Sequence, residues 1–310
     1  MPKFAVAIAV YNKETHIAQT LQSVLDQTFT NFEVVIVNDG STDASETEIQ
    51  QFSDQRIQYS YQENKGAGAA RNAAIAQTTA PWIALLDADD HWEPNYLSEI
   101  NDLIEKHQDH KVFATAIAIE KSGVTVESVY SIPNLKQGET KEVNFFEASS
   151  INSILTSSST VLHRSVLEDV GMYDPRIKSG QDTDLWIRVG LAYPILFLNK
   201  SLATYRLEPQ SLSNTTFNVS DKATFEAYES LEANNPALKK FLDLNRFSLA
   251  ILAKLGNDRE ALRRNYNKIE LSNLNRKQRF LLKAPAYLVK KLHRLKTYFE
   301  GRGIYLTAFS

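Results

Sequence analysis

Apolar residues in the first half of the chain follow two alternating patterns. Continuous apolar blocks at 4–10, 32–37, 57–61 and 82–86 are typical of strands that are buried on both faces. The segments between them predict helices: one with Ile17, Leu21, Val24 and Leu25 on one face and Asn12 as its cap, an alanine-rich one at 66–76, and one at 95–106. Strands that alternate with helices in this way predict an α/β fold with a mostly parallel sheet covered on both faces.

The pattern changes after residue 107. The expected elements there are strands at 111–119, 158–163 and 195–198, and a helix at 182–191. A polar, glycine-containing stretch lies between about 120 and 145, and from about 221 the periodicity is wholly helical. We therefore expect two domains, an α/β domain at 1–215 and a helical C-terminal region at 221–310.

The composition indicates an ordinary soluble protein, because 43% of the 310 residues are hydrophobic and 23% are charged. Without cysteine the chain has no disulfides, so any metal needs oxygen or histidine ligands. The N-terminal apolar run has no small-residue cleavage site and is interpreted as a strand. No stretch reaches the roughly 18 apolar residues of a membrane span. A cytoplasmic location without a nucleic-acid partner is expected.

Charge is distributed unevenly along the chain. Residues 274–302 contain nine Lys or Arg and one acid, a balance of +8, so the remainder must carry −11 to give the net charge of −3. Leu288, Leu292, Leu295 and Phe299 recur at helical spacing within this basic segment. The stripe either packs on the rest of the protein or lies on the inner face of the plasma membrane, with the basic residues near anionic lipid.

Carboxylates cluster where two predicted strands end. Asp39 follows the second strand, and Asp87, Asp89 and Asp90 follow the fourth. In open parallel sheets, ligands bind at the carboxyl ends of the strands. Asp39 also suits a turn followed by a helix cap. Three neighbouring carboxylates exceed what a cap needs, so this loop predicts a site for Mg²⁺ or Mn²⁺ that carries a diphosphate.

Two further segments contain candidate site residues. In "NKGAGAARNAAI", at 64–75, the position that would complete a dinucleotide-binding fingerprint is Arg71, so that interpretation fails. Arg71 can contact a nucleotide or be a surface residue. In "SGQDTDLWIRVG", at 179–190, Asp182 and Asp184 open the predicted helix. Asp182 is either a helix-start residue or a general base.

Five segments together resemble the family-two glycosyltransferases, in family order and spacing. They are "VAIAVYNKETHIAQTLQSVLDQTFTNFEVVIVNDGSTD", "NKGAGAARN", "WIALLDADD", "GQDTDLWIRV" and "YRLEPQSLS", within about residues 3 to 213. The resemblance implies a transferase that depends on a nucleotide-diphospho-sugar and has a GT-A fold. This fold is a Rossmann-like, mostly parallel (mixed) sheet flanked by helices, followed here by the C-terminal helical appendage.

The resemblance also implies roles for individual residues. Asp39 would bind the base, usually uracil, with Arg71 against it and Tyr11 lining the same site. Asp87 and Asp89 would be the DXD pair, with Asp87 toward the ribose and Asp89 on the divalent metal. Asp182 would deprotonate the acceptor hydroxyl. A base on the acceptor and a metal on the leaving diphosphate suit a single displacement, which inverts the anomeric carbon.

One position departs from the family. Two residues after Arg206 the family often has a histidine that can ligate the metal, where this chain has Glu208. Glutamate is an oxygen ligand that favours harder metals, but it also suits an exposed position, so its role stays open.

Other classes of protein are weaker alternatives. A sugar-nucleotide pyrophosphorylase would need a glycine-rich basic loop near the N-terminus, where residues 12–15 offer one lysine and no glycine. A hydrolase lacks the Gly-x-Ser-x-Gly motif. A non-catalytic sugar-nucleotide-binding protein would not need Asp87, Asp89 and Asp182 together. The resemblance favours a transferase for bacterial surface polysaccharide, acting on a glycan or lipid-linked acceptor. The sequence leaves the sugar, the linkage and the oligomeric state open.

Overall fold

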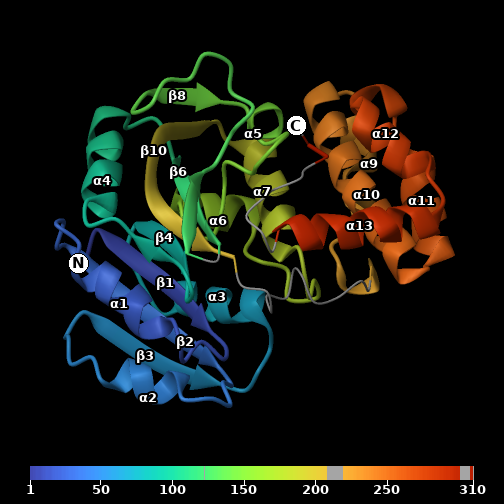
Figure 1. Ribbon diagram of the computed structural model, residues 1–310. Coiled ribbons are helices and arrows are strands. Elements are labelled where there is room, and N and C mark those ends of the chain that lie inside the picture. Colours follow the sequence, from blue (N-terminus) through green and yellow to red (C-terminus); the bar gives the residue numbers. More distant parts are fainter. Residues whose placement is uncertain (122, 208–218, 301–307, 310) are drawn as a thin grey trace.

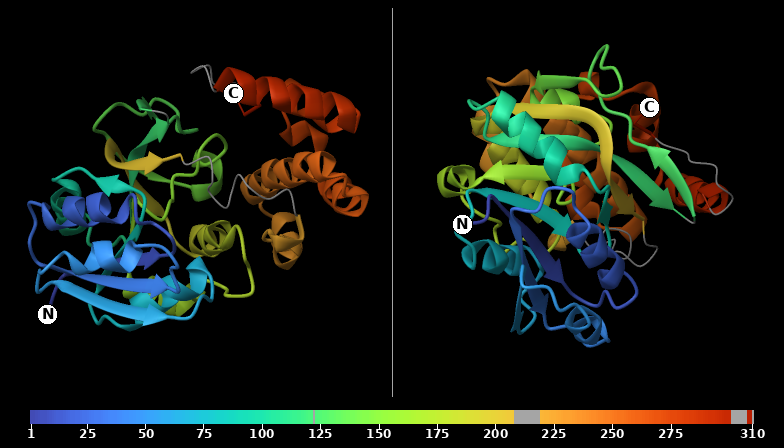
Figure 2. Two further views of the ribbon diagram at one scale, coloured as in Figure 1. Left: turned by 60° about the horizontal axis from the view of Figure 1, so that its bottom comes forward. Right: turned by 90° about the vertical axis from the view of Figure 1, so that its left-hand side faces the viewer.

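The computed structural model describes residues 1–121, 123–207, 219–300 and 308–309. Figure 1 shows a twisted sheet with helices on both faces and, beside it, a group of helices from the C-terminal part of the chain. Figure 2 shows from two further sides that these C-terminal helices gather on one flank of the sheet. The α/β class predicted from the apolar blocks is confirmed.

The first half of the sheet is parallel, in the order β3-β2-β1-β4. Its strands have the predicted positions and extend by up to two residues at their ends. The bounds are β1 Phe4–Val10, β2 Phe32–Asp39, β3 Ile57–Gln62 and β4 Trp82–Asp87. Side chains of β1 alternate between two apolar clusters, Ala5 and Ala7 on one face and Val6 and Ile8 on the other. Burial on both faces explains the apolar character of β1, β2 and β4, whereas the edge strand β3 contains only half-buried and exposed residues.

The second half of the sheet is mixed. Strand β9 is antiparallel to both β4 and β6, whereas β10 is parallel to β6. The expected strand at 195–198 continues to Arg206 through a register shift between Leu198 and Ala203. The bounds are β5 His91–Trp92, β6 Val112–Lys121, β7 Val124–Glu127, β8 Thr140–Val143, β9 Thr160–His163 and β10 Ile195–Arg206.

Helices cover both faces of the sheet. The face that contains Val6 and Ile8 packs on α1 and α4, and the opposite face packs on α3, α5, α6 and α7. Close packing of α7 on α5 requires Gly190, since a Cβ there would lie 2.7 Å from the Phe145 side chain. The bounds are α1 Ile17–Leu25, α2 Ser45–Gln50, α3 Ala67–Ala76, α4 Tyr96–Lys106, α5 Phe145–Ala148, α6 Arg164–Val170 and α7 Gln181–Ala192.

The predicted cap of α1 is wrong. His16, and not Asn12, precedes this helix, and Asn12 has a left-handed backbone with φ 51°. Its side-chain oxygen accepts a hydrogen bond from the Thr42 amide at 2.8 Å, and its own amide donates to Ser41 at 3.0 Å. Asn12 therefore ties the turn after β1 to the turn after β2.

The C-terminal region is helical, as predicted. Helix α10 begins at Pro236 after a cap by Asn235, whose side chain accepts from the Leu238 amide. Phe241 of α10 packs on Phe145 and Phe146, with ring centroids 5.1 and 5.6 Å apart, so this helix shares the core of the α/β domain. The bounds are η1 Val219–Asp221, η2 Glu226–Tyr228, α9 Glu229–Glu232, α10 Pro236–Gly256, α11 Arg259–Lys268, η3 Leu271–Asn273, α12 Arg276–Lys283 and α13 Ala286–Glu300.

Helix α13 packs on α10, and its apolar residues do not all face one way. Val289 is buried at 3% exposure, whereas Leu295 is 44% exposed and Tyr287 is 75% exposed. Leu288, Leu292 and Phe299 of the predicted stripe are half-buried. None of the described helices is both long and apolar enough to cross a membrane.

Candidate active site

The candidate site lies where β1, β2 and β4 end. In the register of the sheet, Asn38 pairs with Val10, and Asp87 pairs with Ala9. Asp39 and Asp87 therefore flank the end of β1, at the edge where parallel sheets bind ligands. Tyr11 follows on from β1 between them and is 45% exposed.

Asp39 is buried and organises the turn before α3. Its carboxylate accepts hydrogen bonds from Gln62 Nε2 at 2.7 Å, from the Lys65 amide at 2.9 Å and from the Gly66 amide at 2.8 Å. The next residue, Gly40, has φ 74°, and a Cβ there would lie 2.8 Å from the Asn64 amide nitrogen. The structure thus gives Asp39 a structural role, and its contact with a nucleotide base stays a prediction.

The three carboxylates after β4 have three different partners. Asp87 pairs with Arg71, and Asp89 pairs with Lys13 Nζ. Asp90 is 1% exposed, accepts a hydrogen bond from the Arg206 amide at 2.9 Å and another from the Ser158 hydroxyl. Burial raises the pKa of Asp90 well above its ordinary value, and Asp87 and Asp89 raise it further.

Ser158 links two of these carboxylates, and sequence reasoning missed it. Its hydroxyl donates to Asp90 and accepts from the Asp87 amide at 3.2 Å. Strand β9 pairs with β4 so that His163 lies opposite Trp82 and Val161 opposite Ala84. The same register, continued past β9, brings Ser158 opposite Asp87. The sequence held no signal for this contact, because it depends on an antiparallel pairing between distant segments.

Arg71 connects Asp87 with Asp182. Its guanidinium is 8% exposed, and Nη1 lies 3.3 Å from Asp182 Oδ1, an ion pair without hydrogen-bond geometry. It also lies over the Tyr173 ring at 5.3 Å. Burial alone would lower the pKa of Arg71, but Asp182 and Asp87 outweigh burial and raise it well above the ordinary value. Arg71 is therefore a buried cation between two acids, and its contact with a nucleotide stays a prediction.

The two acids that open α7 differ in their surroundings. Asp182 is 36% exposed and accepts a hydrogen bond from the Ser157 hydroxyl at 2.8 Å. Asp184 is paired with Arg188 at 2.9 Å and accepts from the Tyr228 hydroxyl at 2.6 Å. Asp184 thus fastens α7 to its neighbours, whereas Asp182 keeps a solvent-accessible carboxylate oriented by Ser157 and Arg71.

A cavity of about 390 Å³ opens beside Asp87 and Asp182. Its walls come from the segment 145–157, from the start of α7, from Tyr205 at the end of β10 and from α10. Burial raises the pKa of the Tyr205 hydroxyl, and Asp90, Asp87 and Asp89 add to this shift. Both predicted acids therefore face a space large enough for a small ligand.

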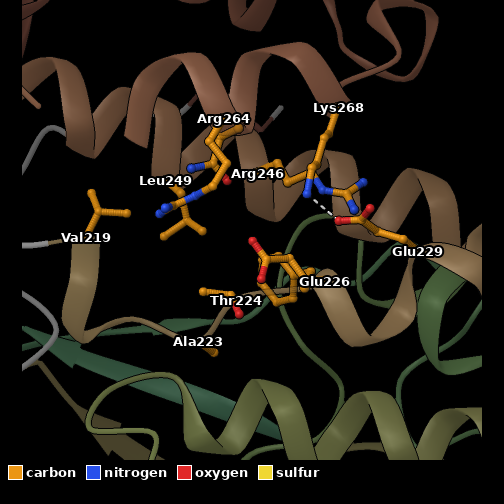
Figure 3. Close-up of a pocket in the computed structure, with 11 residues that line it drawn as sticks. Val219, Ala223, Thr224, Glu226, Glu229, Arg246, Leu249, Arg264 and Lys268 are labelled. Atoms are coloured by element: carbon orange, nitrogen blue, oxygen red, sulfur yellow. Dashed lines mark hydrogen bonds and ion pairs between the residues drawn. The ribbon is translucent and has the colours of Figure 1, made fainter. Parts of the chain in front are cut away.

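A second cavity lies in the C-terminal region, away from these acids. Figure 3 shows Arg246, Arg264 and Lys268 on one side of it and Glu226 and Glu229 on the other, with Lys268 paired to Glu229. Its volume of about 20 Å³ is that of roughly one water molecule. This space is too small for a substrate.

The described residues contain no group of three or more histidines or acids arranged to hold a metal. Glu208 lies outside the described residues. Among the three loop carboxylates, Asp89 has the most displaceable partner, because Lys13 is flexible and 27% exposed. One or two carboxylates together with substrate phosphates commonly suffice for Mg²⁺. Asp89 therefore fits a metal that arrives with a diphosphate.

Comparison with known proteins gives consistent matches. The family described as Glycosyl transferase family 2 matches residues 5–171. Glycosyltransferase GlyA of Streptococcus pneumoniae serotype 4 is 32% identical over 223 residues, 68% of this chain and 31% of GlyA, so the chain spans about a third of that protein. The putative teichuronic acid biosynthesis glycosyltransferase TuaG of Bacillus subtilis is 28% identical over 235 residues, 74% of this chain and 89% of TuaG.

A solved structure shares the fold. The crystal structure of S. aureus TarS 1-349 in complex with UDP-GlcNAc has a TM-score of 0.64 and 20% identity, and the match covers 94% of this chain and 92% of that one. At this identity the likeness shows the GT-A fold alone.

Proposed function

The chain belongs to glycosyl transferase family 2, and we propose that it transfers a sugar from a UDP-sugar to a hydroxyl of a glycan or lipid-linked acceptor, with inversion. One observation carries this proposal: Asp87 at the end of β4 and Asp182 at the start of α7 are joined by Arg71 and face one cavity. In this proposal Asp87 is the nucleotide-side acid and Asp182 the acceptor-side acid, and their shared cavity supports their action on the same sugar.

The nature of the donor is supported by the TarS complex, whose ligand is UDP-GlcNAc. The proposed role in surface polysaccharide synthesis is supported by TuaG, which is named for teichuronic acid biosynthesis. We therefore propose a UDP-sugar as donor and a bacterial surface polysaccharide as the product.

Asp182 is the proposed general base. Its carboxylate is held from one side by the Ser157 hydroxyl and from the other by Arg71, which fixes its direction toward the cavity. It would take the proton of the acceptor hydroxyl while that oxygen attacks the anomeric carbon and the diphosphate leaves. Attack on the face opposite the leaving group inverts the configuration.

Asp89 is the proposed protein ligand of a divalent cation, Mn²⁺ or Mg²⁺. When bound, the cation would supply positive charge for the leaving diphosphate. A cation at Asp89 would compete with the ion pair to Lys13, and a lysine released from that pair would be free to meet phosphate oxygens. Asp87 would keep its ion pair with Arg71 and would contact the ribose of the donor.

Replacing Asp182 with asparagine tests this function. We expect Asp182→Asn to lower kcat by roughly two or more orders of magnitude, as loss of a general base does, with UDP affinity nearly unchanged. Asp102→Asn, an exposed acid of α4, is the matched control and should keep the wild-type rate. A variant that retains most of the wild-type turnover would reduce Asp182 to a helix-start residue.

A further inference from the structure

The cavity beside Asp182 has a wall made by the C-terminal region. Phe241, Leu244, Asn245 and Ser248 of α10 line it opposite the two acids. The packing of Phe241 on Phe145 and Phe146 holds this wall against the α/β domain. A ligand that reaches Asp182 through this cavity therefore lies against α10.

The charged side chains that line the cavity are acidic. Asp87 and Asp182 are the only ionisable acids or bases besides Tyr205 among the described residues that line the cavity. The nearest guanidinium, that of Arg71, is 8% exposed, pairs with both acids and does not line the cavity. A phosphate or carboxylate in this space would meet two negative groups, with no exposed cation from the described lining to balance it.

Three serine hydroxyls of the lining also favour an uncharged ligand. Ser150 donates to the Glu147 carbonyl, Ser153 to the Leu155 carbonyl and Ser248 to the Leu244 carbonyl. A carbonyl oxygen cannot donate, so each serine uses its one hydrogen within the protein and offers only lone pairs to a ligand. Lone pairs and carboxylates accept hydrogen bonds. These three hydroxyls and the two carboxylates suit a ligand rich in O–H donors, whereas an anionic oxygen, which can only accept, is limited to the remaining donors of the lining, such as the Ser149, Thr183 and Tyr205 hydroxyls.

The cavity also has aromatic surfaces. Trp186, Phe241 and Phe309 contribute to its lining. Apolar side chains beside hydroxyl acceptors suit a sugar ring, which has C–H faces and an O–H rim.

From these contacts we infer that the acceptor group bound next to Asp182 is an uncharged polyhydroxyl sugar, not a phosphate- or carboxylate-bearing unit, and that α10 forms its far wall. This inference rests on the proposed transferase function. It gives the C-terminal helices a part in acceptor choice that the nucleotide-side residues do not have.

Pairs of glycosides that differ only in charge test the inference. The probes are p-nitrophenyl β-glucoside against β-glucuronide, and p-nitrophenyl β-galactoside against β-galacturonide. Binding is followed by saturation-transfer NMR in the presence of UDP, and transfer by UDP release from a panel of UDP-sugars. We expect a neutral probe to exceed its uronide by about tenfold or more, as repulsion from a nearby carboxylate predicts.

A charge placed on the α10 wall provides the matched variant. Ser248→Lys should reduce the preference for the neutral probe to less than about threefold, because it supplies the missing cation. Asn267→Lys adds the same charge at an exposed position of α11 outside the cavity and should keep the wild-type preference. Thermal unfolding of both variants checks that they are folded.

The outcomes separate the two proposals. The proposal of a neutral acceptor is overturned, and the transferase function stands, if UDP is released and one of three results is found. The protein uses both probes equally, it prefers the uronide, or it binds none of the probes. A preference for the neutral probe in binding that Ser248→Lys reduces, without UDP release from any donor, overturns the transferase and keeps a neutral-sugar site.

Discussion

Replacing Arg71 with methionine should destabilise the protein more than any other loss of a single ion pair in the site. Methionine keeps most of the side-chain volume, so the change removes charge and little packing. Removing one partner of a buried pair costs about 3–5 kcal/mol. Asp87 and Asp182 are 28% and 36% exposed, so both can be partly rehydrated, and the expected cost falls to about 2–3 kcal/mol.

Thermal unfolding measures this cost. For a chain of 310 residues a loss of about 2–3 kcal/mol should lower Tm by roughly 3–5 °C. Arg176→Met is the matched control, because Arg176 pairs with Asp174 at 2.6 Å but is 88% exposed, so the loss of its charge should shift Tm little. Asp87→Asn in the Arg71→Met background should recover part of the loss, since it removes one uncompensated charge. Equal Tm shifts for Arg71→Met and Arg176→Met, or no recovery, would refute the reasoning.

Three further predictions follow from the loop after β4 and from α13. Mn²⁺ should raise the affinity for UDP in the wild type but not in Asp89→Ala, and calorimetry that gives equal UDP affinity in excess EDTA and in Mn²⁺ would contradict this. Burial raises the pKa of Asp90 above 3.8, so its contribution to stability is present at low pH and is lost as pH rises through the raised value. Asp90→Asn should therefore gain stability relative to wild type as pH rises from about 4 through that raised pKa in urea unfolding, and parallel pH curves would argue against it. Lys291 and Arg294 are exposed on α13, and each basic residue near an anionic surface contributes about 1 kcal/mol, so the protein should float with anionic vesicles at low salt and less so after Lys291→Glu with Arg294→Glu. Equal, negligible flotation with anionic and neutral vesicles would leave α13 a packing helix.

The fold was predictable where a local pattern and the tertiary environment agree. Strand β1 has the predicted bounds because every position from Phe4 to Val10 is buried or nearly so. Strand β10 was predicted too short, because the polar residues 199–201 interrupt the apolar block at the point where the pairing with β6 changes register. The predicted helix cap at Asn12 was wrong for a different reason. Its residue type suits a helix start, but its side chain instead contacts the turn after β2.

The site was likewise predictable only in part. Strand order alone brings Asp39 and Asp87 to one edge, so their proximity followed from the sequence. The side chains that contact these acids could not be predicted from the sequence. Ser157 contacts Asp182 from 25 residues away, Ser158 contacts Asp90 from 68 residues away and Tyr173 contacts Arg71 from about 100 residues away, and nothing in their local sequence marks those contacts.

In the proposed function, the donor side and the acceptor side of the site depend on different parts of the chain. On the donor side, Asp87 and Asp90 are fixed by Ser158, and the Arg206 amide joins this group to the end of β10. A change in any one of these groups disturbs the others, because they share hydrogen bonds and buried charge. The α10 wall is held mainly by aromatic packing on α5. Since that packing includes none of the site's acids, substitutions on α10 can alter acceptor choice while the acids around Asp87 keep their geometry.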